Sequence, residues 1–65
     1  MENKDREKLF RVEMARCGHT QRDIAALMGM TLSAFNRRIK GRIKWQISEL
    51  EKAAGIYGKD RKYFV

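Results

Sequence analysis

Residues 20–41 constrain this chain more than any other stretch, because their pattern predicts two short helices joined by a tight turn. Thr20 can cap the first helix, and Asp23 three residues later can complete a capping box with it. Gly29 follows at a position where we expect a positive φ, which glycine adopts at little cost. Residues at helical spacing mark the expected buried face of the first helix, namely Ile24, Leu27 and Met28.

The second helix of this stretch is expected over residues 32–40, with Thr31 as its N-cap and Gly41 directly after its end. Its expected inward side chains are Leu32, Phe35 and Ile39. The opposite side carries Ser33, Arg37 and Lys40, with Asn36 at its edge. A basic face without an acidic residue, opposite an apolar face, is what a DNA recognition helix needs.

The flanking segments also predict helices and no strand. One helix is expected over residues 5–16, after a frayed start at residues 1–4, and another over residues 47–57, capped by Gln46 or by Ser48. The expected inner faces of these two helices are Leu9, Phe10, Met14 and Cys17, and Ile47, Leu50, Ala53, Ala54 and Tyr57. Glu13 lies at the edge of the first of these stripes.

The connecting segments are expected to pack on these helices. Trp45, in the loop after the second helix of residues 20–41, is expected on the core, with base stacking as the alternative. His19 is expected to be a partly packed connector. Asp60 can cap one last turn, residues 61–64, which would return the end of the chain to the core. The expected fold class is therefore all-α with four to five helices.

The length of 65 residues predicts a single domain, residues 1–65, which buries only about 60% of the surface of its unfolded chain. The one cysteine, Cys17, excludes an internal disulfide, and no Cys and His cluster offers a metal site, so we expect no cofactor. No apolar run reaches the length of a signal peptide or a membrane span. We therefore expect a cytoplasmic protein without a membrane partner.

The charge balance points to a polyanionic partner. The chain has 15 Lys and Arg against 8 Asp and Glu, a formal charge of +7. Charge alone does not separate DNA from RNA or from an anionic membrane. The sequence contains no acidic residue between Asp23 and Glu49, and in this interval fall Arg37, Arg38, Lys40, Arg42 and Lys44. This asymmetry places the partner beside residues 32–44.

Residues 9–65 resemble the helix-turn-helix domains of the Cro and phage-repressor type, often called XRE-like. The matching positions are Gln21, Ile24-Ala25, Met28-Gly29-Met30, Thr31, Phe35 and Ile39-Lys40-Gly41-Arg42. The resemblance implies a lambda-repressor-like fold and a sequence-specific transcriptional regulator of phage or mobile-element type, a repressor, that binds double-stranded DNA. Because one recognition helix covers few base pairs, we expect a symmetric homodimer on DNA.

By the docking geometry of that family, the helix over residues 32–40 enters the major groove and reads the bases. The expected base contacts are Ser33 and Arg37, with Asn36 and Leu32 beside them. Asn36 could read adenine or contact a phosphate, and Leu32 could touch a thymine methyl or pack inward. The expected contacts to the DNA backbone are Gln21, Thr31, Arg38, Lys40, Arg42 and Lys44, helped by the backbone N–H groups after Gly41. For Arg38, a salt bridge to another helix is the alternative.

Other functions fit the sequence less well. We expect no enzyme and no small-molecule substrate, because the chain has one His and one Cys and no pair of convergent catalytic groups. An antitoxin-like or other protein-binding module on the same fold is the main alternative, and a large exposed apolar patch would favour it. RNA binding is weaker, because no exposed aromatic residues are set for base stacking. The dimer surface is guessed at residues 63–65 and at the loop before the last helix.

Overall fold

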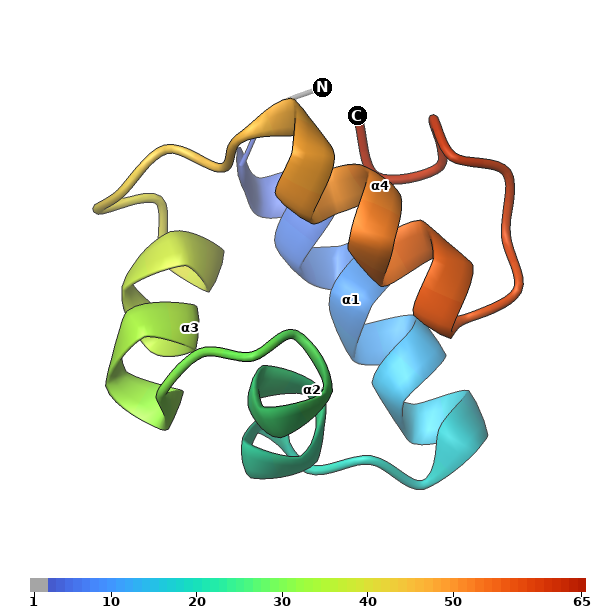
Figure 1. Cartoon of the computed structure of the whole chain (residues 1–65), viewed down its shortest axis with the longest axis horizontal. Coiled ribbons are helices and arrows are strands. Elements are labelled where there is room, and N and C mark those ends of the chain that lie inside the picture. Colours follow the sequence, from blue (N-terminus) through green and yellow to red (C-terminus); the bar gives the residue numbers. More distant parts are fainter. Residues whose placement is uncertain (1–2) are drawn as a thin grey trace.

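Four α-helices follow one another in the computed structural model, which describes residues 3–65 (Figure 1). They are α1 (Asn3–Cys17), α2 (Gln21–Leu27), α3 (Leu32–Ile39) and α4 (Ile47–Ile56). The described residues contain no strand, so the predicted all-α class is confirmed. The expected frayed start covers Met1 and Glu2, which lie outside the described residues, and Asn3 and Lys4, whose backbone begins α1.

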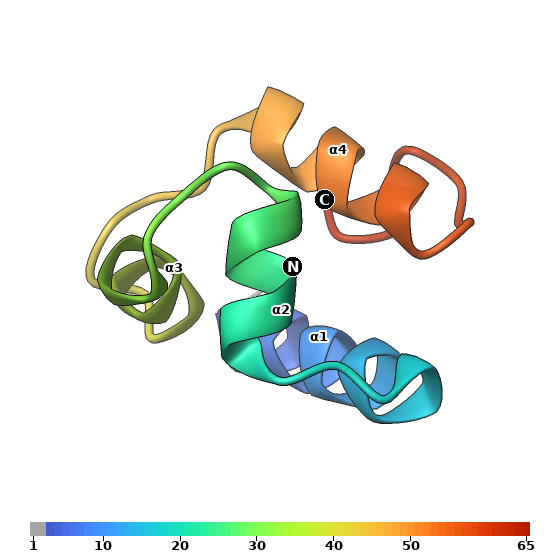
Figure 2. The same cartoon turned by 60° about the horizontal axis from the view of Figure 1, so that its bottom comes forward.

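The helices surround one core, with α3 at one side of it. Figure 2 shows α2 between α1 and α4, and in both views α3 lies at one side of the molecule, joined to α2 by a tight turn and to α4 by a longer loop. Residues 61–64 form a turn instead of a fifth helix, in which Asp60 Oδ1 accepts a hydrogen bond from the Lys62 N–H at 2.9 Å. This turn still returns the chain to the core, as expected, because Phe64 is fully buried.

The centre of the core is a cluster of aromatic rings around Phe10 of α1. Phe10 stacks on Phe64 with a centroid distance of 4.1 Å and on Trp45 at 5.1 Å. The ring of Phe35 of α3 meets Phe10 edge-on at 5.8 Å. The prediction that Trp45 packs on the core is thus confirmed. The cluster joins α1, α3, the α3–α4 loop and the C-terminal turn, so it connects segments that are far apart in the sequence.

Four side chains expected on the inward faces of the helices lie at the surface instead. Leu27 is 50% exposed, Ile47 56% and Leu32 37%, and Cys17 is also exposed. The buried residues of α2 and its C-cap are Ile24, Ala25 and Met28, and Leu27 is about 100° around the helix axis from Met28. Cys17 and Ile47 are terminal residues of α1 and α4. The helical pattern of apolar residues therefore continues one residue past the buried core at the end of α1 and at the start of α4.

The helix starts follow the local sequence. At α2 the Thr20 N–H donates to Asp23 Oδ2 at 2.8 Å and the Asp23 N–H donates to Thr20 Oγ1 at 3.2 Å, so the predicted capping box is confirmed. At α4 the cap is Gln46, whose N–H donates to Glu49 Oε1 at 2.9 Å. Of the two caps considered for α4, the structure shows Gln46.

Glu13 is buried at 3% exposure and links α1 to the C-terminal turn. Its carboxylate accepts a hydrogen bond from the Tyr63 hydroxyl at 2.9 Å and pairs with Arg16 at 2.7 Å and Lys59 at 3.8 Å. Burial alone would raise the pKa of Glu13, but the hydrogen bonds from Arg16 and Tyr63 and the two nearby cations hold the pKa below 4.5. From the sequence alone, Glu13 was expected only at the edge of the apolar face of the first helix.

We expect Phe64→Ala to lower the free energy of unfolding by about 3–5 kcal/mol, because it removes a fully buried ring from the aromatic cluster. That loss is comparable to the whole stability of a domain of this size. Urea denaturation followed by circular dichroism measures it. Val65→Ala is the matched control at a 39% exposed neighbour and should change the free energy by less than about 0.5 kcal/mol.

Acid should destabilise the protein partly through Glu13. Because its pKa in the folded state is lowered, its contribution to stability is present above the pKa of the unfolded state and is lost as the pH falls through the folded one. Between about pH 7 and about pH 3, the free energy of unfolding should therefore fall more for the wild type than for Glu13→Gln. Glu51→Gln is the control for the loss of one carboxyl group, because Glu51 makes no ion pair among the described residues. Equal slopes for wild type and Glu13→Gln would contradict the prediction.

Two glycines should respond to alanine with opposite signs. Gly29 has φ +72°, so Gly29→Ala should destabilise by about 1–2 kcal/mol, although the added Cβ would only touch Lys52 Nζ at 4.0 Å. Gly55 lies inside α4 with open space around it, so Gly55→Ala should stabilise by about 0.5–1 kcal/mol. Thermal unfolding of both variants measures the two changes in stability. An unchanged stability of Gly29→Ala would mean that alanine adopts this positive φ without cost, which would contradict the prediction.

Candidate nucleic-acid interface

The orientation of α3 is set by the turn before it and by two buried side chains. Gly29 has the positive φ that the sequence predicted, and the Met30 N–H donates to the carbonyl of Ala25 at 3.0 Å. Thr31 Oγ1 then accepts the N–H of Ala34 at 3.0 Å and caps α3. Phe35 and Ile39 are 0% and 3% exposed, and with them pointing inward the opposite face of α3 points to solvent.

The residues that the sequence assigned to base contacts lie together. An open hollow of about 410 Å³ is lined by Gln21, Leu32, Ser33, Asn36, Arg37 and Arg42, so it joins the start of α2, the exposed face of α3 and the loop after it. All four expected base-contacting residues are in this set. Leu32 is 37% exposed and lines the hollow, so of its two alternatives the inward one is wrong.

Arg37 lies at the middle of the exposed face. It is about 180° around the helix axis from the midpoint between the two buried anchors Phe35 and Ile39. Among the residues that the structure describes, its side chain has no hydrogen bond and no ion pair within the chain. Ser33, one turn earlier, is also exposed. Both side chains are therefore free to contact a ligand.

Asn36 is held at the edge of this face, as expected. Its Nδ2 donates to Gln21 Oε1 at 3.2 Å, which joins α3 to the start of α2. Two amides facing each other in this way also present unused donors and acceptors to the outside. A contact between Asn36 and a base would therefore be supported from the side by Gln21.

Lys40, also expected at a phosphate, pairs with an acidic residue of α1. Lys40 Nζ lies 3.2 Å from Glu7 Oε2, and Arg11 Nη2 lies 2.7 Å from the same oxygen. The hydrogen bond from Arg11 is the largest influence on Glu7, and together with Lys40 it lowers the pKa of this carboxyl below 4.5 against the opposing effect of burial. The side chain of Lys40 remains 45% exposed.

Arg38 makes the salt bridge to another helix that was its alternative. Arg38 Nε lies 3.2 Å from Glu49 Oε2 of α4, and Arg38 Nη1 donates to the carbonyl of Ala34 at 3.2 Å. Both charged side chains are only 20% exposed. The structure thus places Arg38 between α3 and α4, beside the exposed face and not on it.

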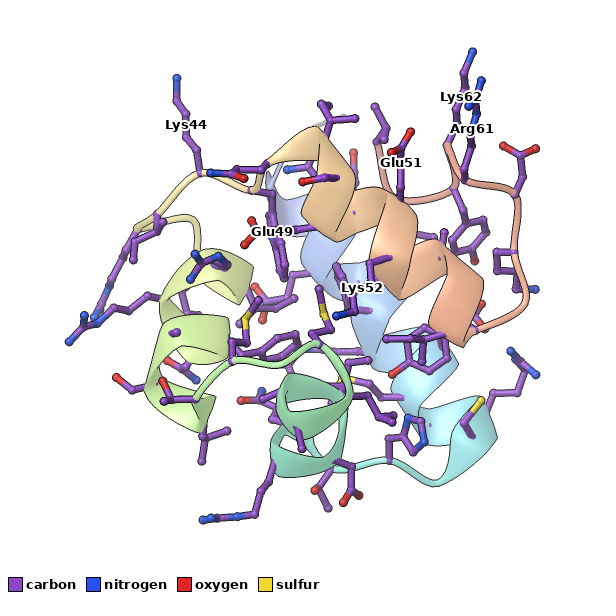
Figure 3. All side chains as sticks on the ribbon, viewed as in Figure 1. Lys44, Glu49, Glu51, Lys52, Arg61 and Lys62 are labelled. Atoms are coloured by element: carbon purple, nitrogen blue, oxygen red, sulfur yellow. The ribbon has the colours of Figure 1, made fainter. Side chains whose placement is uncertain are left out.

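The loop after α3 folds back on the end of that helix. Gly41, with φ +81°, allows the N–H groups of Arg42 and Ile43 to donate to the carbonyl of Arg37 at 2.9 and 3.3 Å. The N–H of Gly41 itself donates to the carbonyl of Arg38 at 3.1 Å. The N–H groups of Arg42 and Ile43 are therefore already bonded to a carbonyl of α3 and are not available to a phosphate in this structure. The side chain of Lys44 points away from the body of the protein (Figure 3).

Some features of this surface were not predicted. The ion pairs of Glu7 with Lys40 and of Glu49 with Arg38 were not predicted. The paired residues are 33 and 11 positions apart, and the sequence does not show that they lie close together. Arg22 is an exposed cation in the first turn of α2, directly after Gln21, and was not predicted as a contact. Its position beside an expected phosphate contact was the signal that could have indicated it.

Within residues 3–65 no helix is both long enough and apolar enough to cross a membrane. The same residues contain no group of three or more His, Cys, Asp or Glu side chains that could hold a metal ion.

A comparison with models of protein families gives a match over nearly the whole chain. A family model described as the BetR domain matches residues 2–65, which is nearly the whole chain. The comparisons with curated proteins and with solved structures gave no match.

Proposed function

This chain belongs to the BetR domain family, a helix-turn-helix DNA-binding family, and from this premise we propose that it is a sequence-specific transcriptional repressor of phage or mobile-element type. In the proposed complex, α3 lies in the major groove of double-stranded DNA. The observation that carries this proposal is the exposed face of α3, where Ser33 and Arg37 stand opposite the buried Phe35 and Ile39.

The side chains on this face suit the edges of bases. Arg37 can donate two hydrogen bonds to O6 and N7 of guanine, a contact worth about 1–3 kcal/mol of discrimination. Asn36 can read adenine while Gln21 supports it, and Leu32 can touch a thymine methyl. Ser33 can donate to or accept from several bases. We propose these four residues as the base contacts.

The surrounding groups suit the phosphates. Arg42 and Lys44 are exposed on the loop after α3, and Gln21 and Thr31 are at the starts of α2 and α3, where backbone N–H groups favour an anion. Lys40 can join them by leaving Glu7. Such contacts fix the position of the protein on the duplex and carry no sequence information.

The proposal includes a homodimer on DNA, with two half-sites about 34 Å apart, in a cytoplasmic and non-catalytic protein. Part of the surface guessed for this dimer is not accessible. Phe64 is fully buried, so from that guess the partly exposed Tyr63, Val65 and the loop of residues 41–46 remain.

Selection of bound duplexes from a random pool tests the proposal. We expect enrichment of a two-fold symmetric sequence with half-sites about one helical turn apart. Enrichment of a single half-site would support sequence-specific DNA binding and would reject the proposed homodimer. Failure to enrich any sequence, together with no binding of mixed duplexes at low salt, would reject the proposed function.

Two substitutions should separate the reading of bases from the binding of phosphates. Arg37→Ala should weaken the selected duplex by about 1–3 kcal/mol and relax the preference at one base pair. Lys44→Ala should weaken selected and mixed-sequence duplexes alike and reduce the slope of log K against log salt by about 0.9. Fluorescence anisotropy over a salt series measures both. Equal losses on both kinds of DNA from both variants would contradict this division.

The alternative of a protein-binding module finds no specific support. The large apolar residues exposed within residues 5–65 come from six different segments: Val12, Leu27, Leu32, Ile43, Ile47 and Val65. Exposed apolar residues are common on soluble proteins and are not by themselves evidence of a protein-binding site. We therefore propose no second function.

A further inference from the structure

Two acidic side chains hold α3 from two other helices. Glu7 of α1 pairs with Lys40, and Glu49 of α4 pairs with Arg38, each at 3.2 Å. A phosphate that approaches α3 would compete with both carboxylates for these cations. Whether a pair opens depends on which hydrogen bonds, ion pairs and solvent contacts the carboxylate and the cation would keep after they separate.

The pair between Glu7 and Lys40 can open at little cost. Glu7 keeps its shorter contact to Arg11, at 2.7 Å, when Lys40 leaves. The side chain of Lys40 is 45% exposed and has no other hydrogen bond among the described residues. Glu7 is therefore a competitor of the DNA for Lys40.

The pair between Glu49 and Arg38 is held more strongly. Arg38 also donates to the carbonyl of Ala34, and Glu49 also accepts the N–H of Gln46 at 2.9 Å. Both side chains are 20% exposed. If Arg38 moved to a phosphate, the partly buried carboxylate of Glu49 would lose its cation, and no other cation of the described residues pairs with it. This unpaired negative charge would then lie next to the negatively charged DNA. This pair should therefore persist on DNA.

Glu49 also determines where the loop of residues 41–46 ends. In Figure 3 its side chain extends from the start of α4 toward α3. The N–H groups of Arg42 and Ile43 attach the beginning of the loop to α3, and Glu49 attaches its end to the same helix through Arg38. The loop carries Lys44 and is thus fixed at both ends.

We propose that Glu49 is a positioning residue of the DNA interface, which holds α3 and the loop of residues 41–46 in docking geometry through Arg38 and Gln46. Glu7 has the opposite effect, because it competes with DNA for Lys40. This inference rests on the proposed function. It reassigns Arg38 from a phosphate contact to a structural link between α3 and α4.

Glu7→Gln and Glu49→Gln form a matched pair, because each removes one negative charge beside α3. Charge alone would make both variants bind DNA more tightly. We expect Glu7→Gln to bind selected and mixed-sequence duplexes about twofold to fivefold more tightly. Glu49→Gln should instead bind the selected duplex about threefold or more weakly and have a lower ratio of selected to mixed-sequence affinity. Gln at position 49 can still accept the N–H of Gln46, so α4 should keep its cap.

Arg38→Gln and Lys40→Ala give a second measurement that does not depend on Glu49→Gln being folded. The slope of log K against log salt should be unchanged for Arg38→Gln and smaller by about 0.9 for Lys40→Ala. Circular dichroism checks that each variant is folded.

Tighter binding by Glu49→Gln, or a slope reduced by about 0.9 in Arg38→Gln, would overturn the role of Glu49. If the wild type binds no duplex at all, the proposed function itself fails. These failures are distinct, because the first two require a wild-type protein that binds DNA.

Discussion

The stacking of Phe10 on Phe64 and Trp45 is the interaction on which the rest of this structure depends. These rings come from α1, the C-terminal turn and the loop after α3, and Phe35 brings α3 to the same cluster. A chain of this length has little apolar surface to bury, so four large rings in contact provide much of its core. The orientation of α3 is therefore fixed by the aromatic core as well as by the turn from α2.

Polar contacts then attach α3 to each of the other helices. Asn36 contacts Gln21 of α2, Lys40 contacts Glu7 of α1, and Arg38 contacts Glu49 of α4. They come from the borders of the exposed face and leave its middle, at Arg37, free. A helix that reads bases must keep one angle to its partner, since small displacements break bidentate hydrogen bonds. The arrangement thus combines a fixed helix with unengaged side chains at its centre.

Short-range features of the fold could be predicted from the sequence. The capping box of Thr20 and Asp23, the positive φ of Gly29 and the cap at Thr31 each depend on residues within a few positions, and all three are present. Burial at helix ends could not be predicted. Helical spacing gives a direction around the axis, but whether Cys17 or Ile47 is covered depends on where the neighbouring helix stops.

In the candidate site, too, the sequence predicted the features that depend on nearby residues and missed those that depend on the packing of distant helices. The exposed positions of α3 follow from periodicity around Phe35 and Ile39, so Ser33 and Arg37 were predictable. The ion pairs of Glu7 and Glu49 join residues 33 and 11 positions apart, and only the packing of α1 and α4 against α3 brings them together. Spacing likewise did not predict that the N–H groups after Gly41 bond back to α3.

The place of Phe64 in the core has a consequence for synthesis. A ribosome makes α1 first, and it makes Phe64 54 residues after Phe10, on which Phe64 stacks, so the helices emerge before their central packing partner exists. Isolated helices as short as α2 and α3 are marginal in water. The nascent chain should therefore stay largely unstructured until Phe64 has left the exit tunnel, and folding should follow translation of this segment.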